Sequence, residues 1–143
     1  LCLFVHVHFS TGLVRLYFLW SSIIMILRIP MPVSANARLT RSCRGRGRVE
    51  TSKYRSWKEQ AIWLIKSQID KPFSPEAKIH VDVTLHFPDK RKRDVDNPMK
   101  GFLDACSIAG VWNDDSQVDV LNIKRGELQP HNGELIATIT EIL

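Results

Sequence analysis

Cysteine is scarce in this sequence, and its few cysteines exclude two common ways of stabilising a small domain. The three residues, Cys2, Cys43 and Cys106, are odd in number and far apart. No pair has the spacing of a zinc site, and together they outline no disulfide framework. We therefore expect free thiols in a reducing compartment, which favours a cytoplasmic protein.

Basic residues outnumber acidic residues only modestly. Lys and Arg number 20 and Asp and Glu number 15, so the formal net charge is +5. A basic balance favours a polyanionic partner such as nucleic acid, although many basic proteins bind none. A chain of 143 residues is long enough for one domain with its own hydrophobic core.

Acidic residues are absent from residues 1–24, which are rich in Leu, Phe, Val, Ile and Trp. About 20 apolar residues can span a bilayer, so a membrane anchor is one interpretation of this stretch. Histidine, serine, threonine and arginine interrupt it, and the basic start and small-residue cleavage site of a signal peptide are not clear. The interpretation that we favour is a non-native or disordered apolar extension, followed by one domain at residues 25–143.

Hydrophobic periodicity beyond residue 25 predicts an α+β fold with a small sheet and two main helices. In the segment 77–87 apolar and polar residues alternate, which is typical of a strand with one buried face. In the segment 51–69, Tyr54, Trp57 and Ala61 recur at helical spacing, and Trp57 and Trp63 are expected in the core. Strands are predicted over residues 26–31, 77–87, 118–126 and 134–142, and helices over residues 51–69 and 98–109.

The ends of the two predicted helices carry recognisable signals. Thr51 or Ser52 can cap the first helix, because a hydroxyl accepts a hydrogen bond from a free amide of the first turn. For the second helix Asn97 is a suitable cap, Pro98 suits the first position and Gly110 suits the stop. Within that helix Lys100 and Asp104 lie one turn apart.

Two basic segments stand out. Residues 33–50 lack an apolar period, so we expect a loop that is mobile without a ligand; the alternative is a solvated loop without a role. Residues 90–93 form a second basic run directly after the strand predicted at 77–87. Side chains that grip phosphates give steeply salt-dependent binding. The residues that we expect to contact DNA are Arg44, Arg46, Arg48, Lys90, Arg91, Lys92 and Arg93.

Carboxylates surround one lysine just after the second basic run. If the chain is extended at Asp94 and Asp96, both side chains point to one side, and Lys100 can reach back toward them. Because a helix of about 12 residues is about 18 Å long, we expect an antiparallel strand to bring Asp114 or Asp115 back to the site. The alternative is that Asp94 and Asp96 are only turn and capping residues.

This set of side chains matches the needs of phosphodiester hydrolysis. A divalent metal lowers the pKa of bound water and bridges phosphate oxygens. Mg²⁺ prefers a few carboxylates together with water and phosphate, and a lysine adds positive charge where negative charge grows. The pattern therefore predicts a metal-dependent enzyme that acts on nucleic acid.

Two spaced motifs resemble those of the RusA-like Holliday junction resolvases. Residues 87–100 contain the basic run, Asp-x-Asp-Asn and a lysine four residues after the second Asp, and residues 109–115 contain the Gly-x-x-x-Asp-Asp turn. The opening at residues 29–36 and the last strand are also similar to that family. The resemblance covers residues 25–143 and implies a mixed α/β fold. It further implies a small homodimeric endodeoxyribonuclease of DNA recombination and repair, often carried by prophages.

The same resemblance implies roles for individual residues. Asp94, Asp96 and Asp115 would bind Mg²⁺ or Mn²⁺, Lys100 would be the essential lysine, and Asp114 would be a less critical neighbour. The implied substrate is four-way junction DNA, cut by paired symmetric nicks that the two active sites of a twofold dimer would supply. No small-molecule cofactor and no membrane partner are expected.

Three other functions stay open from the residues alone. The first is a catalytically inert branched-DNA-binding module of prophage origin, against which the intact set of aspartates and lysine argues. The second is a membrane-associated protein that uses residues 1–24. The third is a nuclease for a different branched DNA.

Overall fold

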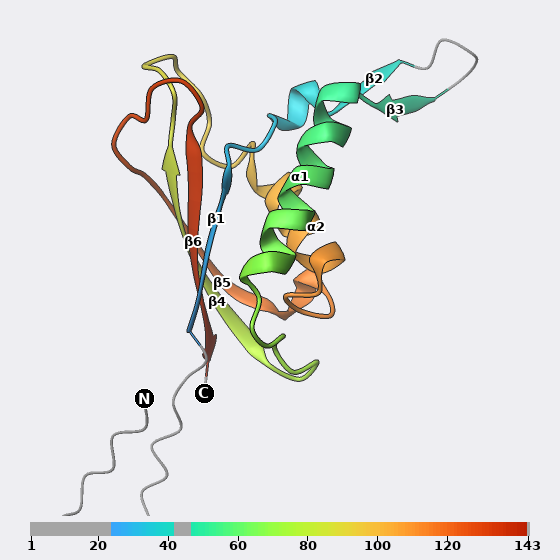
Figure 1. Ribbon diagram of the computed structural model, residues 1–143, viewed down its shortest axis with the longest axis vertical. Coiled ribbons are helices and arrows are strands. Elements are labelled where there is room, and N and C mark those ends of the chain that lie inside the picture. The colour runs from blue at the N-terminus through green and yellow to red at the C-terminus, as the bar shows by residue number, and fades with distance from the viewer. Residues whose placement is uncertain (1–23, 42–46, 143) are drawn as a thin grey trace, which may run out of the picture.

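A four-stranded sheet with two helices on one face makes up the protein (Figure 1). The computed structural model describes residues 24–41 and 47–142. The α+β fold class is confirmed, with a mixed sheet and two main helices. The elements of this layered part are β1 (Ile24–Pro30), α1 (Ser52–Gln68), β4 (Lys78–His86), α2 (Met99–Ala109), η2 (Asp115–Gln117), β5 (Val118–Arg125) and β6 (Glu134–Ile142).

The strand order is β1-β6-β4-β5, so strands distant in sequence lie side by side. β6 pairs antiparallel with both β1 and β4, whereas β5 pairs parallel with β4. A parallel pair needs a long crossover connection, and here residues 87–117 supply it, with α2 inside. Every carboxylate and lysine of the predicted active site lies in this crossover.

The core lies between the sheet and the two helices. The alternation predicted for β4 is confirmed, because its apolar residues are buried and its polar residues face the other side. Helix α2 contributes Phe102 and Cys106, which are fully buried, and each large apolar side chain of this kind contributes about 1.5–3 kcal/mol. The sheet side chains of this core are Met25, Leu27, Ile29, Ile79, Val81, Val83, Leu85, Leu135, Ala137 and Ile139.

The ends of the helices agree with the sequence signals at Thr51 and Gly110 but not at Asn97 and Pro98. The Thr51 hydroxyl accepts a hydrogen bond from the Tyr54 amide at 3.2 Å, as predicted for the start of α1. Gly110 ends α2 in the left-handed conformation, at φ 85°. The prediction that Asn97 caps α2 was wrong. Pro98 precedes the helix without a side-chain cap, and the Asn97 amide donates instead to Asp94 at 3.1 Å.

The core assignment of the two tryptophans on α1 was correct for only one of them. Trp57 is buried, and its indole N–H donates to the Pro30 carbonyl at 3.1 Å. Trp63 is 69% exposed, so its placement in the core was wrong. The buried stripe follows Trp57, Ala61 and Ile65. Trp63 lies two positions beyond Ala61, and at 3.6 residues per turn two positions lead to the opposite side of a helix.

The arginine-rich segment is not only a loop. It contains η1 (Ala35–Ala37) and two short antiparallel strands, β2 (Leu39–Arg41) and β3 (Arg48–Glu50), which project as an arm beyond the start of α1 (Figure 1). Short strands of this kind are held by backbone pairing, which apolar periodicity does not report. Arg44 and Arg46 lie outside the described residues.

The expected N-terminal extension falls almost entirely outside the described residues, which begin at Ile24. We had placed Ile24 in that extension, but it belongs to β1, where it pairs with Thr140 of β6. Within residues 24–41 and 47–142 no helix is both long enough and apolar enough to cross a membrane.

Candidate active site

The predicted catalytic residues all lie on the crossover, on three successive pieces of it. Asp94 and Asp96 precede α2, Lys100 lies in its first turn, and Asp115 opens η2. The chain is not extended at the first two, since it bends at Val95 and Asp96 before a turn leads into the helix. The condition under which Asp94 and Asp96 would point to one side is therefore not met.

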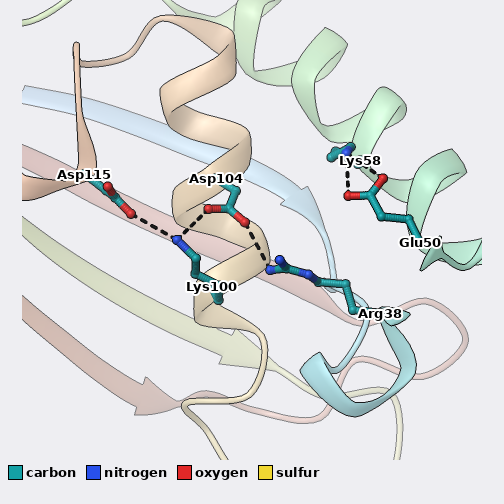
Figure 2. A network of polar contacts seen from close by, with 6 residues as sticks. All are labelled: Arg38, Glu50, Lys58, Lys100, Asp104 and Asp115. Carbon is teal, nitrogen blue, oxygen red and sulfur yellow. Dashed lines mark hydrogen bonds and ion pairs between the residues drawn. The ribbon is translucent and has the colours of Figure 1, made fainter. Parts of the chain in front are cut away.

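Lys100 lies between two carboxylates. Its Nζ is 2.8 Å from Asp104 Oδ1 and 3.3 Å from Asp115 Oδ2 (Figure 2). The hydrogen bond that Lys100 donates to Asp104, with a further contribution from Asp115, raises the pKa of Lys100 above its ordinary value. The lysine is therefore a cation throughout the neutral range, and at 57% exposure its side chain is open to a ligand.

The chain returns from α2 to Lys100 by a different route from the one expected. No strand runs back along the helix; residues 110–114 form bends that lead into η2. Gly110 reverses the chain, and Trp112 anchors the return because its buried indole donates to Ser107 at 2.8 Å. The prediction of an antiparallel strand was wrong, because a short turn with one buried aromatic side chain already brings Asp115 beside Lys100.

Asp114 and Asp115 have different surroundings although they are neighbours. The Asp114 carboxylate caps η2 by accepting the Ser116 amide at 2.8 Å, and these hydrogen bonds lower the pKa of Asp114. The Gln117 side chain completes a capping box by accepting the Asp114 amide at 3.3 Å, and it also accepts the Asn113 amide at 2.8 Å. Asp114 therefore holds the turn, which leaves Asp115 to face Lys100.

Asp94 and Asp96 are exposed, and among the described residues the side-chain hydrogen bond of this pair is the one that Asp94 accepts from the Asn97 amide. Across the part of the chain that the structure describes, no three His, Cys, Asp or Glu side chains are grouped closely enough to hold a metal ion. Lys100 and Asp115 are brought together, but Asp94 and Asp96 are not joined to them in such a group. The metal site thus stays a prediction, supported by the oxygen donors that hard cations prefer.

Two residues of the second basic run contact Asp89: Arg93, and more weakly Arg91, whose Nε lies 3.9 Å from Asp89 Oδ2. Arg93 forms two hydrogen bonds with Asp89, at 2.5 and 2.9 Å, and its guanidinium lies 5.7 Å from the centre of the Phe87 ring. The Arg93 hydrogen bond lowers the pKa of Asp89 to about 2. Arg93 therefore braces the loop. The side chains open to solvent are those of Arg48 on β3 and of Lys90, Arg91 and Lys92.

Sequence reasoning missed a polar network beside Lys100. Asp104 Oδ2 accepts a hydrogen bond from Arg38 Nη1 at 3.1 Å, and Glu50 forms an ion pair with Lys58 at 2.8 Å (Figure 2). The spacing of Lys100 and Asp104 was a signal for their contact, but nothing in the sequence signals a partner 66 residues away. An open pocket here is lined by Glu50, Tyr54, Lys58, Lys100, Asp104, Ser107, Ile108, Asp114 and Asp115.

Aspartates, an accessible lysine cation and exposed basic side chains on one mixed-sheet scaffold define a class of protein, the nucleases. Residues 30–136 match the family model described as endodeoxyribonuclease RusA. The chain belongs to this family. The RusA-like resemblance and the expectation of an endodeoxyribonuclease are thereby confirmed.

Individual relatives agree with this assignment. The chain is 33% identical over 117 residues to the crossover junction endodeoxyribonuclease of Enterobacteria phage 82 and to that of Escherichia coli K12. Each alignment covers 81% of this chain and 93% of the relative. The crossover junction endodeoxyribonuclease of Aquifex aeolicus is 37% identical over 73 residues, which is 50% of this chain and 57% of that protein.

Proposed function

We propose that this protein is a Mg²⁺- or Mn²⁺-dependent endodeoxyribonuclease that resolves four-way DNA junctions in recombination and repair, in the cytoplasm. Its relatives are named as crossover junction nucleases, which supports this substrate. The structural observation that carries the proposal is the Lys100–Asp115 pair on the crossover that also presents the exposed Asp94 and Asp96.

Asp94, Asp96 and Asp115 are the proposed metal ligands. When bound, the metal would acidify a water molecule and neutralise charge on the reacting phosphate. The donor set supports this role, because carboxylates suit hard cations and because neither Asp94 nor Asp96 forms a salt bridge with any described residue. Asp115 is the one proposed ligand that holds Lys100 in place.

Lys100 is the proposed catalytic cation. Its ammonium group would donate to an oxygen of the scissile phosphate, where negative charge grows in the transition state. Two carboxylates keep it protonated, and more than half of its side chain is exposed. The lysine therefore needs no large rearrangement to reach a phosphate that enters the pocket.

Basic side chains on two separate segments would grip the DNA backbone. Lys90, Arg91 and Lys92 extend from the loop after β4, and Arg48 is exposed on the arm. Arg93 would act mainly by holding that loop through Asp89, and Arg44 and Arg46 are proposed from the sequence alone. Each phosphate contact releases counterions, so junction affinity should fall steeply as salt rises.

We further propose that two copies of the chain act as a dimer, since paired nicks need two active sites. The sheet face opposite the helices is uncovered among the described residues (Figure 1). On this face Ile24 is 65% exposed and Ile26 is 56% exposed, both on β1, and the exposed Ile142 and Val120 lie on β6 and β5. Burial of this face against a second copy would remove an apolar patch from water. Light scattering should give a dimer mass, and Ile26→Lys should halve it.

A nicking assay tests the proposed function. The full chain is mixed with a synthetic four-way junction and Mg²⁺, and a linear duplex of the same sequence is the matched substrate control. We expect two symmetric nicks in the junction, no cleavage of the duplex, and loss of nicking with chelator or with Asp96→Asn. An uncut junction that is nevertheless bound would show an inert binding module instead. Nicking that Asp96→Asn leaves unchanged would contradict the assigned site.

A further inference from the structure

Asp104 connects the lysine of the proposed active site to the arm. It lies on α2 one turn beyond Lys100, and its side chain is only 25% exposed. One oxygen, Oδ1, accepts from Lys100 Nζ at 2.8 Å, and the other, Oδ2, accepts from Arg38 Nη1 at 3.1 Å (Figure 2). The contact of Lys100 with Asp104 is shorter than its 3.3 Å contact with Asp115.

Arg38 stands at the base of the arm, immediately before β2. Its guanidinium lies 5.2 Å from the centre of the buried Tyr54 ring, and its carbonyl accepts the Thr51 amide at 2.9 Å. The Thr51 hydroxyl donates to Ala37 at 2.9 Å. Hydrogen bonds between residues 37–38 and Thr51 therefore hold the two ends of the arm together at its base. From this base Arg38 donates a hydrogen bond to Asp104 of α2.

The second strand of the arm has a separate anchor. Glu50, at the end of β3, accepts from Lys58 Nζ with both carboxylate oxygens at 2.8 Å. This ion pair joins the arm to α1 and does not involve Asp104. The two anchors can thus be broken independently, and only the Arg38 anchor shares a carboxylate with Lys100.

We propose that Asp104 is a positioning residue that fixes the Lys100 ammonium group and couples it to the base of the arm. The inference rests on the proposed nuclease function. A carboxylate that accepts from two cations holds each of them in one direction, because each oxygen has its own donor. A displacement of about 1 Å in a positioned group can cost on the order of 100-fold in rate.

The substitution Asp104→Asn tests the positioning role, because the side chain keeps its size while one acceptor oxygen becomes an N–H donor. The amide that replaces the carboxylate has one acceptor oxygen, so it cannot offer Lys100 and Arg38 separate oxygens as Asp104 does. At saturating junction and Mg²⁺ we expect the single-turnover nicking rate to fall by about 10- to 100-fold. Asp104→Glu keeps two acceptors and should recover most of the rate. Recovery of the Asp104→Asn variant by excess Mg²⁺ would overturn the proposal, because it would make Asp104 a metal ligand.

Two variants of the arm serve as matched controls. Arg38→Ala and Glu50→Gln each remove one anchor of the arm and leave the Lys100–Asp104 contact in place. Both should require more junction DNA for half-maximal nicking, with a rate at saturation within about twofold of the unmodified chain, because that contact sets the lysine position. An Asp104→Asn rate that equals theirs would contradict the positioning role.

A measurement without DNA separates failure of this inference from failure of the nuclease assignment. In chain labelled with ¹⁵N-lysine, the Lys100 ammonium signal should be present, and it should disappear in Asp104→Asn but persist in Arg38→Ala. Hydrogen exchange at the arm base, residues 37–39 and 50–51, should become about 3- to 10-fold faster in both variants, since each loses a charge-assisted hydrogen bond. A Lys100 signal that Asp104→Asn leaves unchanged would overturn the inference even if the protein cleaves junctions.

Discussion

The core of the sheet and the crossover between β4 and β5 are held in place by different interactions. The core side chains of β1, β4 and β6 are buried, and they pack against apolar residues of both helices. In the crossover, Lys100, Asp104 and Asp115 are at least a quarter exposed and are held by hydrogen bonds and ion pairs. Exposed ion pairs contribute only about 0–1 kcal/mol each, so these polar contacts add little to the stability of the fold.

This difference suits the proposed site, which would accept metal and DNA. A side chain held by weak, exposed contacts can exchange a partner at small cost, whereas a buried side chain cannot move without leaving a cavity. Asp115 and Lys100 can therefore change partners while α2 stays fixed by Phe102 and Cys106. Substitutions in the core should therefore mainly lower stability, and substitutions among the exposed polar side chains should mainly lower activity.

The largest effect on stability is expected from the core side of α2. Phe102→Ala removes a fully buried side chain and should lower the free energy of unfolding by about 3–5 kcal/mol. Urea denaturation measures the change. Lys100→Met, on the exposed side of the same helix, is the control and should change stability by no more than about 1 kcal/mol. If both variants lost a similar free energy of unfolding, the buried and exposed sides of α2 would not differ in their contribution to stability.

The largest effect on activity is expected from Lys100 itself. Lys100→Met keeps the length of the side chain but removes the cation, and nicking at saturating junction and Mg²⁺ should fall by about 10²–10³-fold. Junction affinity, measured by fluorescence anisotropy in Ca²⁺, should change by less than about tenfold, because one contact of several is lost. A variant that nicks at the original rate would exclude Lys100 from catalysis.

A smaller effect is expected at the turn that joins the two regions. Gly110 has φ 85°, and a methyl group added there would meet no atom within 4 Å. Gly110→Ala should therefore cost about 1–2 kcal/mol through backbone conformation alone. Thermal unfolding measures this loss. Gly110→Asn should cost less, since asparagine tolerates the left-handed region better, and equal costs would argue against a conformational cause.

The smallest effect concerns acid conditions and the loop after β4. Arg93 lowers the pKa of Asp89 from 3.8 to about 2. A carboxyl whose pKa is lower in the folded state stabilises that state above pH 3.8, and the contribution is lost as the pH falls toward about 2. An NMR titration of Asp89 should show the low midpoint, and Arg93→Gln should move it upward. If Arg93→Gln leaves the Asp89 midpoint unchanged, Arg93 is not the cause of the lowered pKa of Asp89.

Local signals in the sequence predicted much of the fold but only part of the site. The alternation along β4, the Thr51 cap and the Gly110 stop depend on near neighbours, and all three were confirmed. Trp63 was misplaced because its hydrophobicity says nothing about which side of α1 faces the sheet. Asn97 does not cap α2 because the helix begins one residue later, after Pro98.

The sequence by itself determined the chemistry of this protein: the spacing of Asp94, Asp96 and Lys100, the basic run before them, and membership of the RusA family. Only the tertiary structure decided which of these groups meet. Asp115 contacts Lys100 because a buried tryptophan folds the turn back, and Arg38 contacts Asp104 because packing of α1 on α2 brings the arm beside the helix. Contacts between residues far apart in the chain depend on how whole elements pack, which no local pattern records.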